Sequence, residues 1–167
     1  GIEGRFLDSR LSLDLSVYNK KTNDLIITRP LDPSTGYSST QTNIGEIENK
    51  GVEIDLGIDV LRGQDLNWSA FIIYSANESI VTDLGLDTEE IVYSGFSNLG
   101  NVAKVGESLG AIVGSKITTT DAGGRLVNNQ GSYDTTFGTN IIGDANPNFL
   151  LNISNSISYK NFSFNFL

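Results

Sequence analysis

Residues 43–60 read NIGEIENKGVEIDLGIDV, and this stretch decides the fold. From Val52 to Val60 every second residue is apolar, and the residues between them are Glu53, Asp55, Gly57 and Asp59. Successive side chains of a β-strand point to opposite faces, so the alternation predicts a strand with one apolar face and one acidic, wet face. The polar residues before Val52, with their glycines, predict a loop end that leads into the strand.

The same alternation recurs along the chain. Residues 11–18 alternate in this way, and no stretch carries the 3.6-residue apolar spacing of an amphipathic helix. Three short reversals separate strand-like segments: residues 6–11, residues 62–65 between 52–61 and 67–76, and Lys160-Asn161 between 151–159 and 162–167. The chain is therefore predicted to be all-β, with antiparallel up-and-down strands.

The connections between these hairpins are long, about 28–48 and 82–148. Outer-membrane barrels have short turns at the periplasmic end and long loops at the extracellular end, and this chain shows the same order. Structureless loops beyond about 12–15 residues are unusual in compact domains. We therefore expect strands inside the second connection, for example around residues 111–118.

Composition excludes several functions. Eleven basic against twenty acidic residues give a net charge of −9, which disfavours nucleic acid as a partner. The chain has no Cys, Met or His, which excludes thiolate or imidazole metal sites and Ser-His-Asp catalysis within it. No apolar run approaches the roughly 20 residues that a transmembrane helix needs.

The acidic side chains of the strands leave two architectures open. Asp14, Glu53, Asp55 and Asp59 suit a water-filled lumen, where strands of about 9–11 residues cross a bilayer. They equally suit the solvent face of a soluble β-sandwich that acts as a surface binding or adhesion module. Aromatic residues near strand ends favour the membrane, because barrels carry aromatic girdles at both interfaces; they are Tyr18, Trp68, Tyr74, Tyr159 and Phe162.

Three motifs follow one another along the chain. The first is Asn-x-Gly-x-x-x-Asn-x-Gly-Val-Glu, carried by Asn43, Gly45, Asn49, Gly51 and Glu53. The second is Gly-Glu-Ser-x-Gly-x-x-x-Gly, which begins with Gly106, Glu107 and Gly110, and the third combines Gly143 and Pro147 with the later Tyr159, Lys160 and Asn161. Glycine permits sharp turns and bulges, so we interpret Gly45 and Gly51 as structural. Gly106 and Gly110 lack the Lys-Ser/Thr and the helix of a phosphate-binding loop.

In this order the three motifs resemble the carboxy-terminal barrel of SusC/RagA-type TonB-dependent outer-membrane transporters. The resemblance covers nearly the whole chain and departs from the family at Ser108, where proline is usual. It implies that residues 1–167 are part of a large transmembrane β-barrel in the bacterial outer membrane that imports glycans or peptides and is not an enzyme. It further implies a SusD-like lipoprotein partner, contact with outer-membrane lipid, and coupling to the TonB complex. The segment that contacts TonB and the plug domain are both expected to lie outside this chain.

The acidic and aromatic residues of the long connections offer weaker candidates. Carboxylates at Asp87, Glu89 and Glu90 form the densest cluster, but nothing places two of them across a scissile bond. Asp83, Asp87, Glu89 or Asp121 could bind Ca²⁺ through oxygen ligands, although no EF-hand spacing is present; no other cofactor is expected. Three loop aromatics could face substrate: Tyr37, Tyr93 and Phe96.

Both ends of the chain stop within strand-like sequence, so we expect a fragment with unpaired edges at residues 1–6 and 162–167. Residues 2–5 also match a protease-cleavage linker, although residues 6–11 continue as strand, turn and strand. An alternative for the other end is that residues 162–167, with alternating Phe, form the true last barrel strand.

Overall fold

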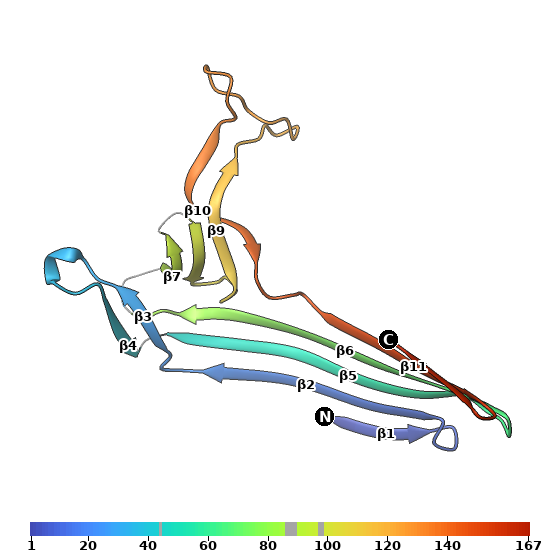
Figure 1. The fold of residues 1–167 in the computed structure, drawn as a ribbon. Coiled ribbons are helices and arrows are strands. Elements are labelled where there is room, and N and C mark those ends of the chain that lie inside the picture. The colour runs from blue at the N-terminus through green and yellow to red at the C-terminus, as the bar shows by residue number, and fades with distance from the viewer. Residues whose placement is uncertain (44, 86–89, 97–98) are drawn as a thin grey trace. The chain divides into compact units, whose positions relative to one another are not determined.

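A computed structural model describes residues 1–43, 45–85, 90–96 and 99–167 (Figure 1). They form strands and one short 3-10 helix, η1 (Pro33–Thr35). Within these ranges no helix is long and apolar enough to cross a membrane. The chain divides into two compact units, the first made of residues 1–20, 49–78 and 147–167, the second of residues 21–48 and 79–146.

Six strands form a long sheet, which makes up most of the first unit. In spatial order they are β1 (Ile2–Phe6), β2 (Leu11–Thr22), β5 (Glu46–Arg62), β6 (Leu66–Asp83), β11 (Leu150–Tyr159) and β12 (Phe162–Phe166). The β1–β2, β6–β11 and β11–β12 pairs are antiparallel. The predicted all-β, up-and-down arrangement is confirmed, and the sheet is open at β1 and β12, as expected for part of a larger barrel.

Three tight reversals join the strands of the long sheet in pairs. Leu7, Asp8 and Ser9 make the first with positive φ values of 55°, 53° and 60°, and Lys160 makes the last with φ 52°. The Lys160 amide donates a 2.8 Å hydrogen bond to the Asp65 carbonyl, which ties the last turn to the middle one. All three predicted turns are therefore present.

The second unit contains the segments inserted between these hairpins. The β3 (Ile26–Pro30) and β4 (Ser39–Asn43) strands form a hairpin inside the connection 28–48, where sequence had indicated only a loop. A four-stranded sheet in the order β10-β9-β8-β7 occupies the second connection. Its bounds are β7 (Glu90–Phe96), β8 (Leu99–Lys104), β9 (Ala111–Ile117) and β10 (Thr135–Asp144), so the strand expected near residues 111–118 is confirmed.

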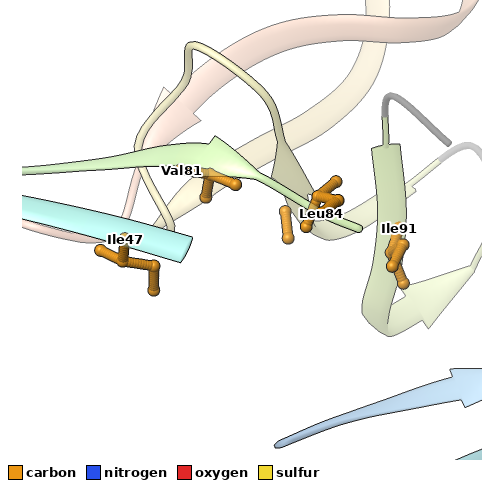
Figure 2. Packing of buried hydrophobic residues seen from close by; sticks show 5 residues of the cluster. Ile47, Val81, Leu84 and Ile91 are labelled. Atoms are coloured by element: carbon orange, nitrogen blue, oxygen red, sulfur yellow. The ribbon is translucent and has the colours of Figure 1, made fainter. Parts of the chain in front are cut away.

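The buried apolar core lies in the second unit. Figure 2 shows Ile47, Val81, Leu84 and Ile91 gathered together, and Ala103 completes the cluster. Val81 and Leu84 are only 1% exposed. Because the core draws residues from β5, the end of β6, β7 and β8, it joins segments that are distant in the sequence. The long connection is therefore a folded region with its own core.

Candidate functional site

One face of the long sheet is apolar from edge to edge. The register places Phe6 opposite Leu11, and Ile153 opposite Ile72, so these side chains share a face with the alternate residues of their strands. Val17 is 70% exposed on this face. Contiguous exposed apolar surface of this size marks contact with a membrane or a partner.

The apolar face ends at the same level on three neighbouring strands. The last apolar residues are Val17, Val52 and Ala76, and the next residues on the face are Asn19, Lys50 and Glu78. On β6 the belt runs from Leu66 to Ala76, 11 residues. At about 3.3 Å per residue and a tilt of about 40°, it is about 25 Å tall, which matches the apolar band of a transmembrane barrel.

Aromatic side chains lie at both ends of this belt. At the end of the belt that is away from the turns, the Tyr74 and Phe149 rings stack with their centroids 6.0 Å apart. Trp68, Tyr159 and Phe162 lie near the turns, as predicted for a girdle. Tyr18 is the exception, because strand alternation places its ring on the opposite face.

Asn155 is the only polar side chain inside the belt among the described residues. Its Oδ1 accepts a 3.3 Å hydrogen bond from the Trp68 indole Nε1. The bond pairs two polar groups that would otherwise face an apolar surrounding, where an unpaired polar group is costly. The belt therefore carries no described side chain that argues against burial in lipid.

The opposite face of the long sheet is polar. Asp14, Glu53 and Asp55 line one depression, together with Ser16, Ser75 and Ile73. Asp59 shares this face nearer the turns, where it forms an ion pair with Arg62. The four acids singled out from the sequence thus lie on one face, and their exposure to a lumen remains a prediction.

Tyr18 crosses this polar face from β2 to β6. Its hydroxyl donates a 3.1 Å hydrogen bond to Asn77 Oδ1. The ring lies directly on the backbone of the intervening strand at Gly51, where a Cβ would overlap ring atoms. The second glycine of the first motif therefore has a steric reason, since any side chain at residue 51 would displace the ring.

Arg62 holds the first turn against the second. Its Nη1 and Nη2 donate to the carbonyls of Asp8 (3.1 Å) and Ser9 (2.7 Å), and its Nε donates to Asp59 Oδ2 (2.8 Å). The three consecutive left-handed residues of the first turn are individually unfavourable for L-amino acids. Arg62 therefore compensates part of that cost.

We expect Arg62→Ala to lower the free energy of unfolding by about 1 kcal/mol, since charge-assisted bonds at an exposed site are weakened by water. Arg62→Lys should recover little of the loss, because an ammonium lacks the planar fork that reaches two carbonyls and a carboxylate. Chemical unfolding of the full-length barrel in detergent measures both. Equal stability of wild type and Arg62→Ala would contradict this role.

The remaining residues of the first motif lie at the entry to β5. Asn43 ends β4 opposite Ile26, and Asn49 lies within β5. Gly45 has φ 101°, which favours glycine, and its carbonyl accepts a 3.3 Å hydrogen bond from the Leu25 amide. The backbone geometry of Gly45 agrees with a structural role, and the roles of Asn43 and Asn49 remain a prediction.

The second and third motifs meet in the second unit. The Ala145 amide donates a 2.9 Å hydrogen bond to the carbonyl of Gly110, so the loop 106–110 contacts the end of β10. Gly143 lies at an irregularity of β10, and Pro147 lies between β10 and β11, outside both strands. Sequence alone indicated each motif but not their contact.

The loop aromatics and acids differ in their exposure and in their contacts. Tyr37 is 72% exposed, whereas the Tyr93 hydroxyl donates a 2.7 Å bond to the Leu109 carbonyl. Burial, and secondarily the charge of Asp144, raise the pKa of Tyr93. The Phe96 side chain, Asp87 and Glu89 lie outside the described residues, and Glu90 pairs with Lys104 at 3.6 Å.

No group of three acidic side chains suited to a metal occurs within the described part of the chain. Asp83 Oδ1 accepts from the Gly85 amide at 2.9 Å, and Asp121 is exposed. A Ca²⁺ site on the acidic loops therefore stays a prediction.

Comparison with known proteins decides between the two architectures. Residues 1–166 match the family described as TonB dependent receptor-like, beta-barrel. The chain belongs to this family. Its members are outer-membrane proteins, so a soluble β-sandwich is not favoured.

Curated relatives extend the match. TonB-dependent receptor P26 of Formosa agariphila is 30% identical over 99% of this chain and 19% of its own length. TonB-dependent receptor SusC of Bacteroides thetaiotaomicron is 27% identical over 99% of this chain and 18% of its own length. The chain thus spans about a fifth of these relatives, which are named as receptors rather than enzymes.

Solved structures show the same barrel fold. The structure of the RagAB peptide transporter superimposes with a TM-score of 0.78 at 21% identity, over 98% of this chain and 19% of that chain. The RagAB peptide importer in its 'closed-closed' state gives a TM-score of 0.75 at 22% identity, with the same coverage of both chains. The SusC/RagA resemblance of the sequence motifs is confirmed.

Proposed function

We propose that this chain forms part of the wall of a TonB-dependent outer-membrane importer, with its polar face along the conduit and its apolar face in lipid. The observation that carries the proposal is the two-faced long sheet. An apolar belt of 11 residues on β6 backs a face lined by Asp14, Glu53 and Asp55. Charged side chains are stable on such a face only where water reaches them.

We further propose that the complete protein imports glycans or peptides together with a SusD-like lipoprotein and the TonB complex. Support comes from the names of its relatives, SusC and the RagAB peptide transporter. Segments outside this chain would supply the plug and the contact with TonB. Gating and transport then place no catalytic demand on the residues described here.

Neighbouring cysteines on opposite faces of β5 test the proposal in the full-length protein. Asp55→Cys places a thiol on the polar face and Ile54→Cys places one on the apolar face. The chain contains no cysteine of its own. A bulky, membrane-impermeant thiol reagent should modify Asp55→Cys in outer-membrane vesicles and reduce substrate uptake, because the adduct would narrow the conduit.

Ile54→Cys is the matched control and should react only with a lipid-soluble reagent, with uptake unchanged. Uptake by both unmodified variants establishes that the substitutions themselves are tolerated. Modification of Ile54→Cys by the impermeant reagent, or full uptake by modified Asp55→Cys, would overturn the assignment of the faces. Competition with glycan or peptide mixtures then identifies the substrate class.

A further inference from the structure

Two loops that are about 35 residues apart in the sequence interlock in the second unit. Besides the Ala145-to-Gly110 backbone bond of 2.9 Å, Asn146 Nδ2 donates to Ser108 Oγ at 3.4 Å. The Asn146 amide in turn donates to Asp144 Oδ1 at 2.8 Å, which orients the carboxylate and the amide side chain together. Both backbone and side chains therefore join the loops.

Gly110 makes the approach sterically feasible. It is buried, and a Cβ at this position would overlap Asn146 Nδ2 and Asp144 Oδ1. Its φ is not positive, so glycine is favoured here because of the limited space and not because of the backbone conformation. Gly143, a few residues away on β10, offers the opposite case, since a Cβ there meets no atom within 4 Å.

Ser108 connects the two sides through its hydroxyl. Its Oγ accepts from the Gly110 amide at 3.1 Å as well as from Asn146, which uses both acceptor positions of a hydroxyl oxygen. The Ser108 side chain thus joins the loop 106–110 to Asn146 through a single hydroxyl group.

The loop is itself fixed to the end of β6. Val81 N donates to Glu107 O at 3.0 Å, Leu109 N donates to Ser79 O at 3.2 Å, and Gly106 N donates to Val81 O at 2.8 Å. Val81 belongs to the buried core. The loop 106–110 therefore has a rigid support on one side and the end of β10 on the other.

The base of the β9–β10 hairpin lies next to this loop, and Ala111 and Val113 of β9 are also buried there with Val102 of β8. In the described part of the chain, β9 pairs with β8 through Gly100–Val113 and Asn101–Ile112. Beyond these pairs the hairpin continues past β7 and β8 toward its tip (Figure 1). The register of β10 shifts twice, between Thr136 and Asn140 and between Ile141 and Gly143.

We propose that Ser108 and Gly110 form, with Asp144, Ala145 and Asn146, a clasp that fixes the base of the β9–β10 hairpin to the end of β6. Gly110 gives the clasp its space and Ser108 is its side-chain pin. These motif residues act as positioning residues for the β9–β10 hairpin. The inference concerns the local fold and is independent of the substrate that the barrel imports.

Paired glycine substitutions in the full-length protein test the clasp. Gly110→Ala should raise amide hydrogen exchange in the peptides that contain residues 109–114 and 142–147 by about tenfold, because the added Cβ displaces the Asn146 and Asp144 side chains that connect the two loops. Gly143→Ala makes the same chemical change in open space and should leave exchange at the wild-type rate. Equal exchange in the two variants would overturn the clasp.

A double-mutant cycle tests the pin without disturbing the backbone. Ser108→Ala and Asn146→Ala should each raise exchange of the Ala145 amide, and the double variant should exchange no faster than the more affected single one. Ser108→Thr retains the hydroxyl and should restore most of the protection. Additive effects, or equal exchange in Ser108→Ala and Ser108→Thr, would remove Ser108 from this role.

Discussion

Replacing Ile153 by arginine should destabilise the barrel by about 2–4 kcal/mol, the cost of a cation on the lipid face near the bilayer midplane. Ile153 pairs with Ile72, close to the middle of the belt that runs from Leu66 to Ala76. The guanidinium would have to leave water or drag water into the hydrocarbon region. Chemical unfolding of the full-length protein in phospholipid vesicles measures the loss.

Ser154→Arg provides the matched control. Ser154 is the next residue of the same strand, and its partner across β6 is Phe71, so its side chain lies on the polar face. The same arginine there should change stability by less than about 1 kcal/mol, because its charge stays in water. Similar losses in the two variants would show that the sheet does not separate lipid from water.

Gly51→Val should have the second large effect, a loss of about 1–3 kcal/mol from overpacking. A side chain at residue 51 would push the Tyr18 ring off β5 and break its 3.1 Å bond to Asn77. Gly51 has no positive φ, so backbone strain does not contribute. The measurement is again the free energy of unfolding in vesicles.

Combining Gly51→Val with Tyr18→Ala separates the steric cause from a general intolerance of valine. Removing the ring empties the space above residue 51, so the double variant should be more stable than the sum of the two single losses predicts. Strict additivity would mean that Gly51 is not required to make room for Tyr18, and another reason for the glycine would be needed.

Most of the long sheet could be predicted from the alternation of apolar and polar residues along its strands. Residues 11–18 and 52–60 alternate without interruption, so the strands over these residues and the face of each acid followed from the sequence. The loop end expected before Val52 was wrong in part, because β5 already begins at Glu46. Short reversals such as Lys160-Asn161 fixed the hairpins, and the three motifs identified the family.

The second unit was harder to predict because its contacts are non-local. The β3–β4 hairpin pairs Ile26 with Asn43, and its sequence lacks a regular apolar alternation. The core joins Ile47 to Val81 and Ile91 across long stretches of chain, which no local pattern reports. The placement of Tyr18 on Gly51 and of Gly110 against Asn146 likewise depends on strands that meet only in the folded protein.

The most direct test of the two-faced wall is a nitroxide scan of residues 52–60 in the full-length protein in bilayers. Each labelled position is measured for accessibility to oxygen, which concentrates in lipid, and to a water-soluble nickel complex. We predict two opposite patterns with a period of two residues: oxygen maxima at Val52, Ile54, Leu56, Ile58 and Val60, and nickel maxima at the residues between them. Uniform accessibility to the nickel complex along β5 would contradict a wall between lipid and conduit.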